Sequence, residues 1–333
     1  MINPSAKLAP AALGGDAESA PTRDGFGKGV VEAGKHDPRV VVLCADLSES
    51  TRAEWFQKEF PDRFVEMGVA EQNMATVASG MAAAGKIPFI ASYAAFNPGR
   101  NYEQIRTTIA LNQVPVKICG MHAGVSVGPD GATHQMLEDI GMMRMLPGMT
   151  VIVPGDAEEA RKATIAAAQT DGPVYLRFGR AATPIFTTAL TPFQIGKALT
   201  LFEEDAPQVA ILSTGSLSHA ALMAAHKLAE EGVATIVLHV PTVKPLDEDA
   251  ILDVAKRAGR VVTVEEHQVA GGFGSAVAEL LVKKHPVPMR LLGIQDRFGQ
   301  SGSPEELLAH YGLDVAHIAD AVRVLVHADT MKS

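Results

Sequence analysis

The sequence alternates between short runs of β-branched residues and longer stretches in which apolar residues recur with helical spacing. The short runs lie at 40–43, 116–119, 150–153 and 174–176. The helical stretches lie at 53–60, 71–84, 102–111, 137–145 and 157–169. Strands that alternate with helices in this way pair in parallel, because each helix carries the chain back across the sheet. The pattern therefore predicts an α/β fold built on a doubly wound sheet.

The alternation lapses once, where turn-forming residues cluster between Arg180 and Pro192. It restarts with expected strands at 209–212, 234–239 and 261–264, and with expected helices at 217–230, 249–256 and 274–283. Residues 1–20 are rich in Ala, Pro and Gly without periodicity, which indicates a tail or a loosely docked arm. The 333 residues thus divide into an N-terminal arm (1–20), a doubly wound domain (21–190) and a smaller doubly wound domain (191–333).

Charge and cysteine content argue against several classes of function. The chain has 29 Lys and Arg residues against 38 Asp and Glu residues, a net charge of −9 that repels nucleic-acid phosphates and anionic lipids. We therefore expect no nucleic-acid partner and no membrane partner. Only Cys44 and Cys119 occur, both in apolar runs, so a disulfide framework is not expected. No signal peptide and no apolar span of about 18 residues is recognisable, which predicts a cytoplasmic protein.

One common catalytic motif occurs in the sequence. Residues Gly124 to Gly128 match G-x-S-x-G, which in hydrolases places a nucleophilic serine, here Ser126, on a tight turn from strand to helix. The residues that follow, Gly128-Pro129-Asp130-Gly131, favour a loop where that helix should begin. A serine hydrolase that loses activity on Ser126→Ala is therefore one alternative.

A second candidate site lies on a glycine-rich loop after the expected strand 116–119. This loop carries His122, Asp130 and His134. Ligands of open α/β sheets bind beyond the carboxyl ends of strands, and imidazoles suit proton transfer to hydroxyl and carbonyl groups. The same side chains could instead only cap turns. A metal site in this chain is not favoured, because no ligand set has the required spacing.

Four further residues each allow two interpretations. Glu71 begins an expected helix, where a carboxylate either complements the helix dipole or has a functional role. Tyr93 and Phe96 follow an expected strand, as core aromatics or as rings that contact a cofactor. Arg180 ends an expected strand, where its guanidinium either binds a phosphate or is a solvated charge.

Together these segments resemble the thiamine-diphosphate enzymes of the transketolase family, from about Pro21 to the C-terminus. Gly68-Val69-Ala70-Glu71-Gln72 resembles the family's segment whose glutamate hydrogen-bonds the aminopyrimidine ring of the cofactor. The loop 128–135 with His122 resembles the family's substrate loop. The resemblance implies catalytic roles for Glu71, His122 and His134. It implies cofactor contacts for Asp46, Glu71, Tyr93 and Phe96, and substrate contacts for Arg23, Ser50, His122, Asp130, His134 and Arg180.

The resemblance also implies a partner. The expected fold is a pyrimidine-binding domain followed by a smaller transketolase C-terminal domain. The family's Gly-Asp-Gly motif, which binds the diphosphate through Mg²⁺, does not occur in this sequence. We therefore expect a separate N-terminal, diphosphate-binding subunit that ligates Mg²⁺, as in a split-gene transketolase, and an α2β2 heterotetramer. The implied reaction moves a two-carbon glycolaldehyde unit from a ketose phosphate to an aldose phosphate, in the pentose phosphate pathway or in a specialised one.

Other assignments stay open from the sequence. The chain could be a β-type subunit similar to deoxyxylulose-phosphate synthase or to 2-oxoacid dehydrogenases. It could also be a non-catalytic regulatory paralogue, although Glu71, His122 and His134 together disfavour that. In the second domain, Glu265-Glu266-His267 lies at an expected strand end without an implied catalytic role. We therefore predict that this domain serves mainly in assembly.

Overall fold

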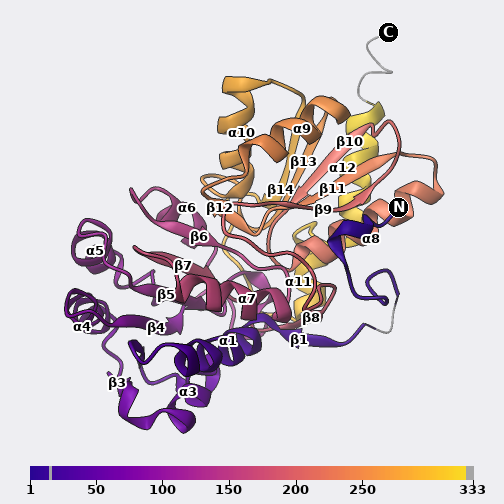
Figure 1. Ribbon diagram of the computed structural model, residues 1–333. Coiled ribbons are helices and arrows are strands. Elements are labelled where there is room, and N and C mark those ends of the chain that lie inside the picture. The colour runs from indigo at the N-terminus through magenta and orange to yellow at the C-terminus, as the bar shows by residue number, and fades with distance from the viewer. Residues whose placement is uncertain (15–16, 328–333) are drawn as a thin grey trace.

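The structure, a computed structural model that describes residues 1–14 and 17–327, contains two large β-sheets with helices on both faces (Figure 1). Residues 15–16 of the expected arm and residues 328–333 of the expected second domain lie outside the described residues. In Figure 1 most of the first half of the chain, coloured indigo to magenta, lies below the second half, coloured orange to yellow, whereas the indigo N-terminal segment lies beside the second half.

The first sheet has seven strands in the order β12-β6-β7-β5-β4-β2-β3. They are β2 (Val40–Cys44), β3 (Phe64–Glu66), β4 (Ile87–Tyr93), β5 (Lys117–Met121), β6 (Thr150–Ile152), β7 (Val174–Arg177) and β12 (Thr242–Lys244). All neighbours are parallel except β12, which comes from the second half of the chain. The chain passes from β2 outward to β3, then returns to β4 and continues in the opposite direction. The connections after β2 and β4 therefore diverge, and such a switch point is where ligands bind in open α/β sheets.

Helices cover both faces of this sheet. Alternate residues of β2 point to opposite faces, so that Val40 and Val42 pack with α1, α3 and α7 while Val41 and Leu43 pack with α4. The helices of this half are α1 (Thr22–His36), α2 (Ser48–Thr51), α3 (Ala53–Glu59), α4 (Glu71–Ala83), α5 (Tyr102–Gln104), α6 (Asp139–Arg144) and α7 (Ala157–Ala168). A π-helical segment (Ile105–Ala110) follows α5, and short 3₁₀ turns lie at Pro61–Arg63 and Val125–Val127.

The second sheet has five strands in the order β14-β13-β10-β11-β9. They are β9 (Leu199–Glu203), β10 (Val209–Ser213), β11 (Thr235–His239), β13 (Val261–Gln268) and β14 (Met289–Ile294), of which only the edge strand β9 is antiparallel to its neighbour. Its helices are α8 (Leu217–Glu230), α9 (Glu248–Ala258), α10 (Phe273–Lys284), α11 (Pro304–His310) and α12 (Val315–His327). The predicted α/β fold with two doubly wound units is confirmed. Among residues 1–14 and 17–327, no helix combines the length and the apolar content needed to cross a bilayer.

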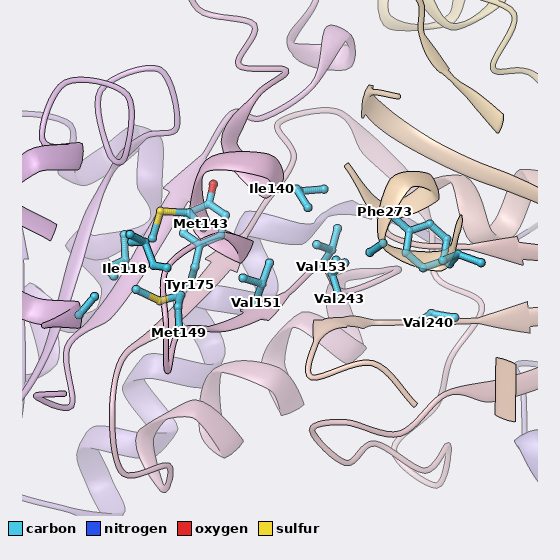
Figure 2. Packing of buried hydrophobic residues seen from close by; sticks show 14 of the residues in the cluster. Ile118, Ile140, Met143, Met149, Val151, Val153, Tyr175, Val240, Val243 and Phe273 are labelled. Carbon is cyan, nitrogen blue, oxygen red and sulfur yellow. The ribbon is translucent and has the colours of Figure 1, made fainter. Parts of the chain in front are cut away.

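One hydrophobic cluster is shared by the two sheets (Figure 2). Ile118 and Tyr175 contribute from β5 and β7, Val153 follows β6, and Val240 and Phe273 contribute from the second half of the chain. All five side chains are buried. The two sheets are therefore joined by a continuous core rather than by a solvated linker.

The first residues of the chain lie along the second sheet. Ile2 forms an antiparallel bridge with Phe202 of β9, and the N–H of Asn3 donates to the carbonyl of Leu201. A 3₁₀ turn at Pro4–Ala6 follows, and β1 (Ser19–Pro21) pairs antiparallel with β8 (Ala182–Pro184) before α1 begins. The described part of the expected arm is thus hydrogen-bonded to the rest of the protein.

Helix α1 was not expected from the sequence pattern, and neither were β14, α11 and α12. Four glycines lower the helix propensity of Thr22–His36. In the structure these glycines permit a close approach of helices, because a Cβ on Gly25 would lie only 2.0 Å from the carbonyl oxygen of Ala157 in α7. A Cβ on Gly29 would lie 2.7 Å from the carbonyl oxygen of Arg161. Close packing of α1 on α7 therefore outweighs the local propensity.

We expect Gly25→Ala to lower the free energy of unfolding by about 1–3 kcal/mol or more, because the added methyl group overpacks the contact between α1 and α7. Gly80→Ala is the matched control, since a Cβ at this helical glycine of α4 meets no atom within 4 Å outside the helix backbone around it. Gly80→Ala should instead stabilise by up to about 1 kcal/mol. Urea unfolding of the isolated chain measures both changes, and equal effects of the two substitutions would contradict the packing argument.

Candidate active site

The residues singled out in the sequence lie on connections at one edge of the first sheet. β2, β4, β5 and β7 are parallel neighbours, so their carboxyl ends meet at that edge. Tyr93 is the last residue of β4, and the connections after these strands supply Asp46, Ser50, Phe96, His122 and Arg180. Two expectations need correction. Tyr93 ends β4 rather than following it, and β7 ends at Arg177, so that Arg180 lies in the connection to β8 rather than at the end of a strand.

Three rings gather around Tyr93. His122 stacks on Tyr93 with ring centroids 3.9 Å apart, and Phe96 stacks on it with centroids 6.0 Å apart. His134 meets Tyr93 and Phe96 edge-on, at centroid distances of 5.9 and 5.6 Å. The Tyr93 hydroxyl donates to Ser50 Oγ at 3.0 Å. We call Tyr93, Phe96, His122 and His134 the ring cluster.

Arg23, in the first turn of α1, lies beside the ring cluster. Its Nη1 donates to the carbonyl of Ser50 at 2.7 Å and lies 3.3 Å from His122 Nε2. Because a guanidinium only donates, His122 Nε2 accepts, and the ring proton is then on Nδ1. His122 Nδ1 and Arg23 Nε are buried and have no hydrogen-bond partner among the described residues. Buried polar atoms of this kind indicate a place where a ligand supplies the missing partner.

The electrostatics of His122 follow from this position. Burial, and then the positive charges of Arg23 and Arg180, lower the pKa of His122 to about 3. The imidazole is therefore neutral near pH 7. Arg23, Arg180 and Arg52 all raise the local potential, in a chain whose net charge is −9. This local reversal of sign suits an anionic substrate.

We expect His122 in the isolated chain to remain neutral from about pH 8 down to about pH 5, well below the ordinary titration range of histidine. Histidine-labelled protein followed by ¹⁵N NMR measures this, with His122→Gln assigning the signal. Between the folded and unfolded pKa values only the unfolded chain binds this proton, so the stability that His122 contributes falls as the pH falls below about 6.5. Arg23→Gln should raise the pKa of His122, and titration of His122 near pH 6.5 in the unaltered chain would contradict the burial argument.

Glu71 is the first residue of α4, and its side chain is 2% exposed. Arg100 Nη1 lies 3.3 Å from its Oε2, and the Arg100 guanidinium lies over the Phe96 ring, 5.3 Å from the centroid. The Asn101 side chain donates to the Glu71 carbonyl at 3.1 Å. Arg100 thus links the buried carboxylate to the ring cluster.

Two acidic residues expected at the site are exposed. Asp46 is exposed, and its N–H donates to Glu66 Oε1 at 2.7 Å. Glu66 also accepts from the N–H of Gly68 at 2.9 Å, which ties the Asp46 connection to the segment before Glu71. Asp130 is exposed on the loop 128–135, whereas His134 of the same loop reaches the ring cluster.

The geometry around Ser126 does not fit a hydrolase nucleophile. Val125–Val127 is a single 3₁₀ turn that ends at Gly128 with φ 85°, and no helix follows it. Ser126 is buried, and its N–H donates to Glu266 Oε1 at 2.6 Å. A nucleophile elbow needs a helix directly after an exposed serine. The hydrolase alternative therefore has no support from the structure.

Sequence reasoning did not single out Arg100, Glu66 or Gln135. Gln135 Nε2 donates to the carbonyls of Val125, Gly128 and Gln300, and so fixes the loop that carries His134. Gln135 lies in the loop 128–135 and Arg100 lies soon after Phe96, so the sequence offered a reason to consider both. Nothing in the sequence pointed to Glu66. Within the described ranges, no group of three or more His, Cys, Asp or Glu residues is arranged to hold a metal ion.

Comparison with known proteins assigns both halves of the chain. Residues 18–185 match the transketolase pyrimidine-binding domain, and residues 196–318 match the transketolase C-terminal domain. A putative transketolase C-terminal section from Methanocaldococcus jannaschii is 43% identical over 304 residues, which cover 90% of this chain and 94% of that protein. The 6-deoxy-6-sulfo-D-fructose transketolase subunit SqwH from Clostridium sp. is 40% identical over 299 residues, covering 90% and 92%.

A solved structure described as a split gene transketolase, inactive beta4 tetramer, matches the fold closely. Its TM-score is 0.85 at 42% sequence identity, and the match covers 92% of this chain and 98% of that chain. The chain therefore belongs to the transketolase family and consists of that family's pyrimidine-binding domain followed by its C-terminal domain.

Proposed function

We propose that this chain is the pyrimidine-binding subunit of a two-chain, thiamine-diphosphate-dependent transketolase. The reaction moves a two-carbon glycolaldehyde unit from a ketose phosphate to an aldose phosphate. The observation that carries the proposal is the buried carboxylate of Glu71, linked through Arg100 to a cluster of two aromatic rings and two imidazoles at the switch point of the sheet.

The residues present fit the aminopyrimidine half of thiamine diphosphate. A flat heteroaromatic ring is bound by aromatic faces and by an acid that hydrogen-bonds a ring nitrogen, and Tyr93, Phe96 and Glu71 offer these groups. When bound, thiamine diphosphate supplies a nucleophilic carbon and an electron sink for chemistry next to a carbonyl group. We assign the ligands of the diphosphate and Mg²⁺ to the partner subunit.

Glu71 would share a proton with the ring nitrogen of the aminopyrimidine. The other site residues would act on the substrate. His122, neutral and with a proton on Nδ1, would donate to a substrate oxygen, and His134 would contact a hydroxyl group nearby. Arg180 and Arg23 would hold the terminal phosphate. Asp46 and Asp130, both exposed, would reach cofactor and substrate only when the partner and the sugar are in place.

The partner is proposed from the relatives. Proteins of nearly the same length as the matched segment are named as a C-terminal section and as a subunit of transketolases. We infer an N-terminal, diphosphate-binding chain as partner and an α2β2 assembly, since most oligomers close with two-fold symmetry. One of these relatives is named for a sulfonated sugar, 6-deoxy-6-sulfo-D-fructose.

Arg180→Ala tests the assignment of the phosphate end. In the reconstituted enzyme, loss of one charge-assisted contact should raise KM for a ketose phosphate about tenfold or more. The KM for the unphosphorylated ketose should change little. For a sulfonated analogue, which carries one charge fewer than the phosphate, the increase in KM should lie between those two increases.

Arg161→Ala is the control, because this residue ion-pairs with Glu158 and Glu32 outside the site. Its KM values should match those of the unaltered enzyme. Equal effects of Arg180→Ala on all three donors would remove Arg180 from the substrate site.

A further inference from the structure

The loop that carries His134 rests on the second half of the chain. Val125 and Leu137 pack in the hydrophobic cluster of the second sheet, and α11 lies against the turn Val125–Val127. The Gln135 side chain donates to the carbonyl of Gln300 at 2.9 Å. The shape of this loop therefore depends on the second sheet and its connections.

Glu266 of β13 makes the most direct contact of this kind. Its carboxylate, in a residue that is 7% exposed, accepts the Ser126 N–H at 2.6 Å. A Cβ at Gly124, where φ is +93°, would lie 2.3 Å from Glu266 Oε1, so only glycine allows this approach. The backbone carbonyl of Glu266 accepts from Arg177 at 2.9 Å. Glu266 is thus held by the first domain through both its backbone and its side chain.

The turn that Glu266 holds also contacts Arg180. Arg180 Nη1 donates to the carbonyl of Val127 at 2.8 Å, one residue after Ser126. Among the described residues this is the hydrogen bond that orients the Arg180 guanidinium, and its other N–H groups remain for a ligand. A continuous path of hydrogen bonds and backbone therefore runs from β13 through the turn to Arg180.

We propose that Glu266 is a positioning residue for substrate phosphate. Its carboxylate fixes the turn Val125–Val127, and the turn aims Arg180 at the substrate. This inference rests on the proposed phosphate-binding role of Arg180. It gives the second domain a part in substrate recognition, beyond the assembly role predicted from the sequence.

The test compares three substitutions on one strand. Glu266→Ala removes the acceptor of the Ser126 N–H, whereas Glu266→Gln keeps an oxygen at that place. Glu265→Ala is the matched control, because the buried Glu265 carboxylate accepts from Phe273 and Gly274 within the second domain. Hydrogen exchange of the isolated chains shows where each substitution acts. Glu266→Ala should speed exchange at 124–135, and Glu265→Ala should speed it at the start of α10.

In the reconstituted enzyme, Glu266→Ala should raise KM for a ketose phosphate about tenfold relative to the unphosphorylated ketose, with kcat nearly unchanged. In Glu266→Gln the ratio of the KM for the ketose phosphate to the KM for the unphosphorylated ketose should stay close to that of the unaltered enzyme. Glu265→Ala should leave this ratio unchanged. Adding Glu266→Ala to Arg180→Ala should have no further effect on the ratio, since both act on one contact. If Glu266→Ala does not fold, Glu266→Asp, which withdraws the carboxylate by one methylene, should raise the same ratio.

The outcomes separate the two proposals. If Arg180→Ala discriminates between the donors but neither Glu266→Ala nor Glu266→Asp does, Glu266 is only structural and the inference is overturned. If Arg180→Ala itself does not discriminate, the phosphate assignment of the proposed function fails, whatever the exchange data show.

Discussion

Glu71→Gln in the reconstituted enzyme is expected to lower kcat by a factor of about 10²–10⁴ while the fold stays intact, the range typical for loss of a positioned acid or base. Glutamine has nearly the same shape as glutamate, so the first turn of α4 and its contact with Asn101 should be kept. The amide, however, cannot share a proton with a ring nitrogen as a carboxyl group does. The loss should therefore appear in kcat at saturating cofactor.

Arg100→Gln is the control for the ion pair that Glu71→Gln also removes. Arg100 is half exposed and its Nη1 lies 3.3 Å from the carboxylate, so its contribution is modest, and activity should fall by less than about tenfold. Circular dichroism and thermal unfolding check the fold of both variants. Near-normal turnover of Glu71→Gln, or an equal loss in Arg100→Gln, would refute a proton-sharing role for Glu71.

The isolated chain is expected to be folded but almost inactive, and to bind thiamine diphosphate weakly. The ring cluster and Glu71 offer contacts for the aminopyrimidine half of the cofactor. We assign the charged half to the partner. Loss of two or three charge-assisted contacts should weaken binding by roughly a thousandfold relative to the complete site.

Calorimetric titration of thiamine diphosphate with Mg²⁺ into each chain and into their mixture measures this difference. The mixture should bind tightly, with one cofactor per pair of chains, and should transfer the two-carbon unit in a ketose-to-aldose assay. Omitting Mg²⁺ should weaken binding to the mixture but leave the weak binding of this chain unchanged. Tight stoichiometric binding and full turnover by this chain alone would be fatal to the two-chain proposal.

The fold was predictable where local pattern and tertiary packing agree. The β-branched runs became strands, and the helix that starts at Glu71 begins at that residue in the structure. Helix α1 was missed because the glycines that weaken it locally are those that let it pack closely against α7 and against α3 with its flanking residues. Propensity describes a segment alone, and this helix exists because of its neighbour.

Family resemblance named most residues of the candidate site, whose catalytic and binding roles stay predictions, but it did not give their contacts. The pairs Arg23 with His122 and Arg100 with Glu71 join positions 99 and 29 residues apart. No local pattern encodes contacts between residues so far apart in the sequence, since these contacts arise from the order of strands in the sheet. Glu266 illustrates the same limit, because its acceptor role depends on a turn 140 residues earlier in the chain.

The continuous core between the two sheets restricts how this protein can move. A hinge between the sheets would expose Val153, Val240 and Phe273 to water on every opening, at about 25 cal/mol for each Å² of apolar surface. The two sheets should therefore move together as one rigid body on the timescale of turnover. In the proposed reaction, entry of the sugar and release of the product then depend on the loops at the carboxyl edge and on the contact with the proposed partner chain. In kinetic terms, the slow steps of a catalytic cycle should be sought in those segments and not in domain closure.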